Sequence, residues 1–538
     1  MENINVNIPK EKFRFADPNR KTGDKKLETK QMSYAKDVFR RFCKNKSSVV
    51  AAIIIALLVL FAILVPLFSE TTYSQSLTDV KNMQYVKLLP KCKLFEGTGF
   101  WDGTKKETVN ENKYNILNAL QVETGENVIV EQYGDKYVKT TLVGESEIST
   151  TYYDIRVDSY LSNGMAFVDV TAEEFEDMQR WQEEKGVQLI YPAVDVKLTG
   201  AFKKPLIADV AKENANVWYE TDSKGNPKLD ADGNYNPCYA LSTASRFQGL
   251  AYTEYYNYDS LRIEGDNGDY LYALVSATRI DENTVICSYN VRVLLDTYFE
   301  YRYGHEASFL FGTDAKGQDI LTRLANGARF SLILAICISA INLFIGAIYG
   351  AIEGFYGGAI DLVMERIADV LGGMPSMVVM SLFQLHLASK VGPVWSMVFA
   401  FVLTGWLGMA ARTRMQFYRF KRQEYVLSAR TLGASDARLM FKHIFPNAMG
   451  TLITGSILMI PGVIFSESSL TYLGIVNLEG STQTSVGTLL ANGNGMLSTF
   501  PHIIFWPALF ISLLEISFNL FGNGLRDAFN PSLKGIED

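Results

Sequence analysis

Several long stretches of this chain contain no charged residue, and they constrain its fold more than any other feature of the sequence. Asp, Glu, Lys and Arg are absent from residues 47–69, 330–352, 370–389, 391–411, 443–466 and 480–514. Between Glu70 and Arg329 the longest such run is only 233–245. A spanning helix needs roughly 20 mostly apolar residues, and a charge at the bilayer centre costs roughly 2.5–3.5 kcal/mol. The sequence therefore predicts a membrane protein with a water-soluble middle segment, and excludes a wholly soluble enzyme.

The charge on either side of the first apolar run predicts the orientation of the chain. Ser47–Phe68 is too long for a signal-peptide core and lacks a small-residue cleavage site before Glu70, so we expect an uncleaved spanning helix. Residues 1–46 hold 13 Lys or Arg against 6 Asp or Glu, which places this tail in the cytoplasm. Residues 69–310 carry a net charge of −15 and would then lie outside.

Five further spans are expected, at about 330–352, 366–388, 392–411, 447–466 and 500–521. Strict alternation then makes the loop 412–446 cytoplasmic. This loop has eight Lys or Arg and two acids, which agrees with the orientation of the first span. The sequence therefore predicts an all-α membrane bundle of six helices with both termini in the cytoplasm.

The outer segment 69–310 is long enough for one or two domains, and we expect an α+β fold there. Alternating polarity predicts strands within 127–143 and 152–170, and the capping box Thr171–Glu174 predicts a helix to about Lys185. A loop or hairpin is expected over 222–236. Its segment Asp230–Asn234 resembles a calcium loop but lacks the required later glycine and glutamate, so a turn is favoured. One disulfide is possible among Cys92, Cys238 and Cys287, and the pair stays open.

The motifs of familiar enzyme chemistry are missing from the sequence. The four histidines have no metal-ligand spacing, and no serine lies in a nucleophile turn. The nearest phosphate-loop candidate, Gly312–Gly317, continues Gln-Asp where Lys-Ser or Lys-Thr is required. We therefore expect no catalytic residue, no metal site and no cofactor in this chain. Any energy for its work must come from a partner.

The cytoplasmic loop 412–446 is the most informative segment. Gln423–Leu432 is expected to form a short helix that Gly433 ends, and Ser435 is expected to cap a second helix ending near Pro446. A short helix between two spans, with small residues on its surface, suits docking into a groove of a partner. An interfacial helix held against anionic lipid is equally compatible with these residues.

The same loop resembles the EAA loop of ABC-importer permeases, especially those of the peptide/nickel subfamily. The matching positions are Glu424, Tyr425, Val426, Ala429, Arg430, Gly433, His443, Ile444, Pro446 and Asn447. Leu427, Ser428 and Phe445 depart from the usual pattern. The resemblance implies that the loop contacts cytoplasmic ATPases through Glu424, Tyr425, Ser428, Ala429, Arg430, Gly433, Ala434 and Pro446.

Two further segments are similar to the same subfamily. The entry to the second span matches at Gly312, Thr313, Asp314, Gly317, Asp319, Arg323, Gly327 and Arg329. The end of the last span matches at Asn519, Gly522, Gly524, Arg526 and Asp527. Three matches in the right order identify the chain as similar to OppC/DppC-type permeases, which have the type I importer fold of the methionine-importer permease. The outer segment would be a large insertion between helices 1 and 2.

The resemblance implies a subunit of a peptide importer in the bacterial cytoplasmic membrane, surrounded by lipid and without a nucleic-acid partner. Its expected partners are a second permease, two ATPases that bind ATP and Mg²⁺, a substrate-binding lipoprotein and the peptide. The resulting domain division is a tail 1–46, a helix 47–68, an insertion 69–310 and a permease core 311–538. A permease for nickel or another small solute, and a receptor sensing ligand through its outer domain, remain alternatives.

Some single residues carry their own hypotheses. Glu515 lies inside the last expected span, where a carboxylate is a functional candidate, although a structural role is equally compatible. Arg366 and Asp369 are expected to form a local ion pair. Three glycines of the second span are expected to pack within the chain rather than against the second permease: Gly346, Gly350 and Gly354. Four apolar residues of the third span are expected to pack in the core rather than line the peptide path: Met374, Met377, Met380 and Phe383.

Overall fold

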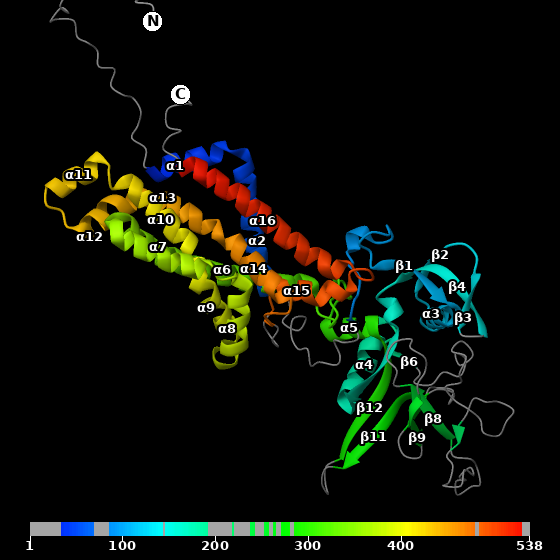
Figure 1. Ribbon diagram of the computed structural model, residues 1–538. Coiled ribbons are helices and arrows are strands. Elements are labelled where there is room, and N and C mark those ends of the chain that lie inside the picture. Colours follow the sequence, from blue (N-terminus) through cyan, green and yellow to red (C-terminus); the bar gives the residue numbers. More distant parts are fainter. Residues whose placement is uncertain are drawn as a thin grey trace, which may run out of the picture.

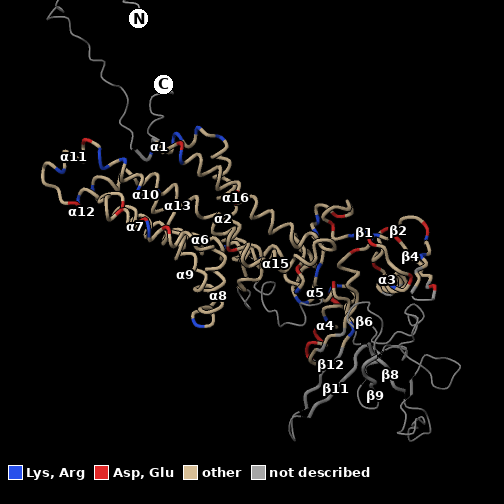
Figure 2. Tube along the Cα trace, viewed as in Figure 1, with Lys and Arg blue, Asp and Glu red and all other residues tan. Residues whose placement is uncertain are grey.

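The structure is a computed structural model of the 538-residue chain. It describes residues 34–68, 85–143, 146–191, 218–219, 237–242, 252–257, 262–264, 271–279, 285–478 and 484–529. A helical bundle occupies one part of the molecule, and a strand-rich outer part lies beyond one end of it (Figure 1). Charged residues gather at the two ends of the bundle and over the outer part (Figure 2).

Five helical segments of the described chain are long and apolar enough to cross a membrane. They are α2 (Lys46–Phe68), α6 (Ile320–Tyr356), α9 with α10 (Pro393–Gly405, Leu407–Phe420), α12 through α14 (Asp436–Tyr472) and α16 (His502–Phe529). A sixth span results if the bent pair α7 (Gly358–Gly372) and α8 (Ser376–Val391) is counted as one. The mostly helical architecture with five or six spans is as predicted.

The prediction of a continuous third span over 366–388 is wrong. The axes of α7 and α8 differ in direction by 72°. Pro375 lies at the break and cannot donate a backbone hydrogen bond, and a proline also disfavours the helical conformation of the residue before it. Gly372 and Gly373 directly precede this segment and weaken helix propagation further.

The expected end of the loop's second helix near Pro446 is also wrong. After α12 (Asp436–Arg438), residues Leu439–Ile444 form a π-helical turn that continues into α13 (Phe445–Ile457) and α14 (Met459–Tyr472). Pro446 therefore lies in the first turn of α13, where its missing N–H matters least. The wider winding of the π turn accommodates the proline without a break.

Three glycines let α6 and α10 approach closely, which confirms that they pack within the chain. A Cβ atom at Gly346 would lie 2.7 Å from the carbonyl oxygen of Trp406. At Gly350 it would lie 2.1 Å from the carbonyl oxygen of Ala410, and at Gly354 2.7 Å from that of Arg414. Only glycine fits at such backbone-to-backbone contacts.

The methionines of the bent pair pack less within the chain than expected. Met380 is buried and Phe383 packs partly against the central apolar cluster of the bundle, as predicted. Met374 and Met377 are exposed, so the prediction of intrachain packing is wrong for these two. Met374 lies at the break and Met377 in the first turn of α8, whereas Met380 further along α8 reaches the core. The expected ion pair between Arg366 and Asp369 is present, at 2.9 Å on the surface.

The described residues of the outer part form three antiparallel sheets. The first comprises β1 (Thr104–Asn110), β2 (Ile129–Gln132), β3 (Tyr137–Val143) and β4 (Ser146–Asp158), with α3 (Glu111–Thr124) on one face. The second comprises β5 (Met165–Thr171), β6 (Ile190–Tyr191), β10 (Arg262–Glu264), β11 (Leu271–Arg279) and β12 (Val285–Leu294). The third comprises β7 (Trp218–Tyr219), β8 (Pro237–Ser242) and β9 (Tyr252–Asn257).

Short sequence patterns in the outer part correctly predicted strands and the start of a helix. Strands occupy most of the two stretches with alternating polarity. The predicted capping box opens α4 (Ala172–Lys185), where the Thr171 side chain accepts a hydrogen bond from the Glu174 backbone N–H. The expected loop 222–236, with Asp230–Asn234, lies outside the described residues. Cys92 is a free thiol, and the side chains of Cys238 and Cys287 lie outside the described part.

Candidate functional site

The loop between α10 and α13 is the first candidate site, and its inner side is firmly packed. Its short helix α11 (Glu424–Thr431) buries Val426 completely. Around Val426 lie apolar side chains from the end of α6, the end of α10 and the π turn: Phe355, Phe417, Leu439, Met440 and Ile444. Burial of such a side chain stabilises its position by roughly 1.5–3 kcal/mol. The loop therefore moves together with the ends of α6 and α10.

The outer side of the same loop is open. Among the residues predicted from the EAA resemblance, Glu424, Tyr425, Ser428, Arg430, Gly433 and Pro446 are exposed, whereas Ala429 and Ala434 are half-buried. Leu432 is 88% exposed, and Tyr425 and Leu427 on α11 are also exposed, so this side of the loop presents apolar surface. Asn447 donates a hydrogen bond to the Tyr425 hydroxyl and fixes one end of α11.

Gly433 ends α11 as predicted. Its φ of +82° lies in the left-handed region that favours glycine, and a Cβ atom there would meet no other atom within 4 Å. The N–H of Ala434 donates to the carbonyl oxygen of Ala429 across this turn. Ser435 is the residue before α12, as expected, but its side chain makes no capping hydrogen bond.

An ion-pair cluster beneath the loop was missed from the sequence. The guanidinium of Arg414 contacts Asp361 (2.6 Å), Glu365 (2.8 Å) and the buried Glu353 (3.5 Å). The Tyr418 hydroxyl donates to Asp361 as well, at 2.5 Å. These side chains come from α6, α7 and α10, so the cluster ties α7 to the ends of α6 and α10, against which the loop packs. The sequence signal for this cluster was the presence of isolated charged residues at the ends of three expected spans.

The motif at the start of α6 lies at the opposite end of the bundle. Gly312 has a φ of +78°, and a Cβ atom there would lie 2.5 Å from the carbonyl oxygen of Leu88. Thr313 is fully buried; its hydroxyl donates to the carbonyl oxygen of Tyr85 (2.5 Å) and accepts from the N–H of Leu88 (2.8 Å). The motif thus joins the start of α6 to the turn at residues 85–88.

The two aspartates of this motif organise the first turn of α6. Asp314 accepts backbone hydrogen bonds from Lys316 and Gln318 and faces Arg323 at 3.6 Å. Asp319 caps α6 by accepting from the N–H groups of Leu321 and Thr322. Burial raises the pKa of both carboxyl groups, against the opposing effects of Arg323 on Asp314 and of the Thr322 hydrogen bonds on Asp319.

The remaining residues of this motif have packing or surface positions. Gly317 adopts a positive φ of +75° in the turn before α6. A Cβ atom at Gly327 would lie 2.9 Å from the backbone of Ser485, just before α15 (Val486–Gly493). Arg329 is exposed and donates to Asn326. The motif therefore shapes the outer end of the bundle, and no described contact joins it to the loop 412–446.

The motif near the end of α16 also packs helices together. A Cβ atom at Gly522 would lie 2.1 Å from the Leu458 side chain, and one at Gly524 would lie 2.1 Å from the Ser48 hydroxyl. Asn519 donates to the carbonyl oxygen of Glu515 one turn earlier, and Asp527 is exposed. Arg526 lines a cavity of about 370 Å³ together with Arg412 and Arg419, so three cations face this hollow.

Glu467 and Glu515 lie well inside their spans, and the sequence drew attention only to Glu515. Glu515, the predicted candidate, is half-buried on α16. Glu467 on α14 is 1% exposed, and accepts hydrogen bonds from the hydroxyls of Ser331 (2.9 Å) and Thr471 (3.3 Å). It was missed because the predicted fifth span ended at residue 466, one position before it. The sequence signal for Glu467 was its position as a charged residue within one turn of an apolar run.

Together these features define a class of protein: a multi-pass membrane protein, with a bundle of five or six candidate spans and a helical loop that is packed on its inner side and open on its outer side. Comparison with known proteins agrees. Residues 342–535 match the family of binding-protein-dependent transport system inner membrane components, and residues 33–90 match the N-terminal TM domain of oligopeptide transport permease C.

Individual relatives give the same result. The chain is 41% identical over 224 residues to the oligopeptide transport system permease protein OppC of Bacillus subtilis, covering 42% of this chain and 72% of the relative. It is 39% identical over 229 residues to DppC of the same organism (42% and 70%), and 33% identical over 227 residues to OppC of Escherichia coli K12 (42% and 73%). The chain therefore belongs to the binding-protein-dependent transport permeases of the OppC/DppC type.

Proposed function

We propose that this protein is the permease subunit of an ATP-driven peptide importer, forming half of the translocation pathway. The observation that carries the proposal is its identity of 33–41% with the OppC and DppC relatives, over about 70% of their length. The open loop around α11 supports it, because a surface fixed to two spanning helices can pass the movement of a partner into the bundle. The receptor alternative is not favoured by any of these matches.

The partners follow from this role. A second permease completes the pathway, two ATPases bind ATP and Mg²⁺ in the cytoplasm, and an extracytoplasmic lipoprotein delivers the peptide. The chain would lie in the bacterial cytoplasmic membrane with both termini inside. We assign contact with the ATPases to Glu424, Tyr425, Ser428, Ala429, Arg430, Gly433, Ala434 and Pro446. We also propose that the outer part receives or retains the lipoprotein.

Co-purification and reconstitution test the function. We expect the tagged chain to retain a second six-helix permease and a pair of Walker-motif ATPases, and the reconstituted complex to accumulate labelled oligopeptides when ATP is supplied. Competition by Ni²⁺ rather than by unlabelled peptides would favour the small-solute alternative. Recovery of a kinase in place of the ATPases would favour a receptor and contradict the proposal.

The loop is tested by Gly433→Trp. The position has open space, and a non-glycine residue with this φ costs about 1–2 kcal/mol, so the chain should still assemble. We expect peptide uptake to fall severalfold while ATP hydrolysis continues. Gly358→Trp is the matched control, because Gly358 also has a positive φ (+60°) and open space but lies outside the loop. Equal losses in the two variants would indicate backbone strain rather than docking.

A further inference from the structure

A loop of the outer part presents large apolar side chains to the surroundings. It comprises residues 93–101, here named the aromatic loop, and carries Leu94 (88% exposed), Phe95 (38%) and Phe100 (67%). Such residues are rarely clustered on a surface that faces only water. Nothing in the permease motifs accounts for this cluster, since it lies between the two segments that match the family profiles.

The position of the aromatic loop is set by contacts with the outer ends of two spans. The Trp101 indole donates a hydrogen bond to the carbonyl oxygen of Leu310, shortly before α6. Its ring lies 5.3 Å from that of Trp506 near the start of α16, which in turn stacks on Phe311 at 4.0 Å. Both α6 and α16 are candidate membrane spans, so the loop lies beside the ends of two candidate spans.

Trp101 adopts an unusual backbone conformation to make these contacts. Its φ of +59° is in the left-handed region, which is costly for a bulky residue and persists only where the surroundings enforce it. The Phe95 ring stacks on Trp101 at 5.9 Å, and Phe100 meets the same ring edge-on at 5.9 Å. The apolar side chains are therefore held in fixed positions relative to the outer ends of α6 and α16.

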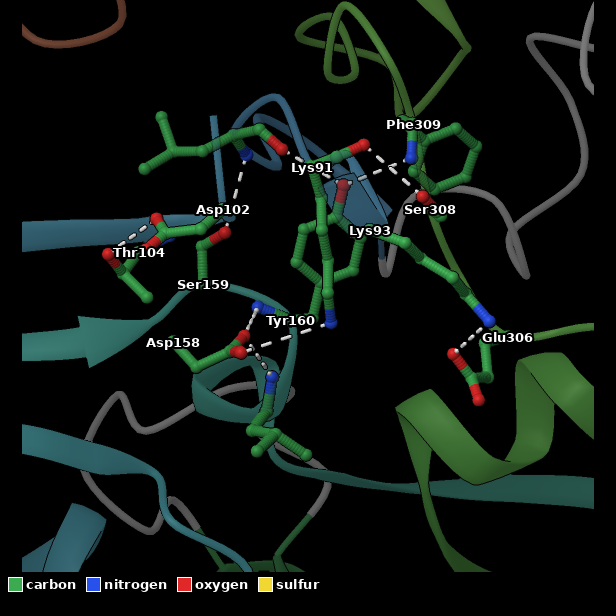
Figure 3. Close-up of polar contacts among 12 residues, drawn as sticks. Lys91, Lys93, Asp102, Thr104, Asp158, Ser159, Tyr160, Glu306, Ser308 and Phe309 are labelled. Carbon is green, nitrogen blue, oxygen red and sulfur yellow. Dashed lines mark hydrogen bonds and ion pairs between the residues drawn. The ribbon is translucent and has the colours of Figure 1, made fainter. Parts of the chain in front are cut away.

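A polar frame holds the base of the loop. Lys93 pairs with Glu306 at 2.9 Å, the Ser308 hydroxyl donates to the carbonyl oxygen of Lys91, and the Phe309 N–H donates to the Tyr160 hydroxyl (Figure 3). On the other side, the buried Asp102 accepts from the N–H of Gly99 at 2.7 Å. The loop thus has a charged base and an apolar tip, and the outer part cannot swing freely about it.

We propose that the aromatic loop inserts Leu94, Phe95 and Phe100 into the outer lipid–water interface and anchors the outer part to the membrane surface. The occupant of this apolar surface is phospholipid at the boundary of headgroups and acyl chains, where aromatic side chains are favoured. Continuity with the spans supports it: Phe505, next to Trp506 on α16, is itself 53% exposed where it would meet the same interface. The proposal depends on the membrane location of the bundle and not on the cargo.

Site-specific photocrosslinking tests this proposal. The photoreactive residue p-benzoylphenylalanine replaces Phe100 in the complete importer, reconstituted in nanodiscs of phosphatidylethanolamine and phosphatidylglycerol with alkyne-tagged acyl chains. The same residue in place of Phe344, which is 68% exposed in the middle of α6, is the lipid-facing control. In place of Leu142, which is 70% exposed on β3, it is the water-facing control.

We expect lipid adducts at position 100 close in yield to those at position 344 and severalfold above those at position 142. Yields at position 100 no higher than at 142 would overturn the proposal. An adduct with the second permease or with the binding protein would also overturn it, by showing that a protein covers the loop. Size-exclusion profiles of the three variants verify that each complex is assembled, and the identity of the transported solute does not affect the outcome.

Discussion

The bundle and the outer part of this protein are held together by different kinds of contact. In the bundle, helices touch backbone to backbone at glycines such as Gly350 and Gly354, and few alternatives fit. In the outer part, antiparallel sheets and stacked rings such as Tyr114 on Tyr153 form separate small cores. The family profiles match 33–90 and 342–535, on either side of most of the outer part. The family profiles therefore cover the bundle and leave most of the outer part unmatched.

The junction between the two regions refines where the outer part begins. The segment up to residue 90 matches the family profile. Its residues Tyr85 and Leu88 form hydrogen bonds with Thr313 in the motif before α6. The N–H of Lys91 donates to the carbonyl oxygen of Phe309 at 2.9 Å, so the chain leaves and re-enters the core at adjacent points. We infer that the insertion runs from about residue 91 to 308, rather than over the whole of 69–310.

The largest loss of folded protein is expected when a larger side chain replaces a glycine at which the bundle has no room for it. Gly350→Leu would force side-chain atoms into the space where a Cβ atom already lies 2.1 Å from the Ala410 carbonyl oxygen. Overpacking of this kind costs about 1–3 kcal/mol, and more where backbone must move. We expect almost no monodisperse protein after membrane extraction. Gly462→Leu is the control, because a Cβ atom at Gly462 meets nothing within 4 Å; similar yields for both variants would contradict the close approach.

A deletion tests whether the outer part is separable from the core. Replacing residues 92–307 with a short flexible linker is geometrically possible, because Lys91 and Phe309 are already joined by a hydrogen bond. We expect a folded bundle that still binds the second permease but has lost most of its affinity for the substrate-binding lipoprotein. Affinity and uptake are measured on the purified complex, and unchanged values would remove the proposed receiving role.

A longer deletion is the comparison for this experiment. Removing residues 75–305 also takes away Tyr85 and Leu88 and leaves the buried Thr313 hydroxyl without its two partners. Each buried polar group left unsatisfied costs about 1–3 kcal/mol. The longer deletion should therefore lower the unfolding temperature of the bundle more than the shorter one, which removes the Leu295 carbonyl oxygen that accepts from the Tyr85 hydroxyl but keeps both partners of Thr313. If both behave alike, the segment 85–90 is not part of the core.

Removal of the Arg414 ion pairs should destabilise the bundle moderately. Arg414→Met leaves Asp361, Glu365 and the buried Glu353 close together without their shared cation. We expect a loss of about 2–3 kcal/mol in the free energy of unfolding, since an unpaired buried charge is costly and water screens part of it. Denaturant titration in detergent measures this. Arg366→Met removes the exposed pair with Asp369 and should change the free energy by less than about 1 kcal/mol.

The sequence predicted those features that depend on neighbouring residues. The apolar runs located the spans, Thr171 and Glu174 located the start of α4, and Gly433 located the end of α11. It could not predict contacts between distant segments: Arg414 meets its partners only when α6, α7 and α10 come together. Likewise, Trp101 and Trp506 are separated by most of the chain. The break at Pro375 was missed because the surrounding run contains no charge, and lack of charge does not distinguish a straight helix from a bent one.

The smallest expected effect belongs to the outer part alone and depends on pH. Asp296 lies in the first turn of α5 (Leu295–Tyr303), and burial raises its pKa to about 6, opposed by Lys91 and reinforced by Asp158 and Glu306. Because the folded pKa exceeds the unfolded value of about 3.9, the folded state keeps the proton longer than the unfolded state does. The contribution of this group to stability is therefore greatest below pH 4, and falls as the pH rises to about 6.

Asp296→Asn should remove this dependence, because the amide stays neutral at every pH. We expect the variant to be more stable than the parent chain by about 1–2 kcal/mol at pH 7, where the partly exposed carboxylate bears its full desolvation cost, and to differ little from it at pH 4. Thermal unfolding followed by tyrosine fluorescence from pH 4 to 7.5 reports on the outer part. A gain that is equal at both pH values would mean that the substitution acts through packing. A shift in the bundle transition as well would mean that the two regions unfold as one unit through the segment 85–91.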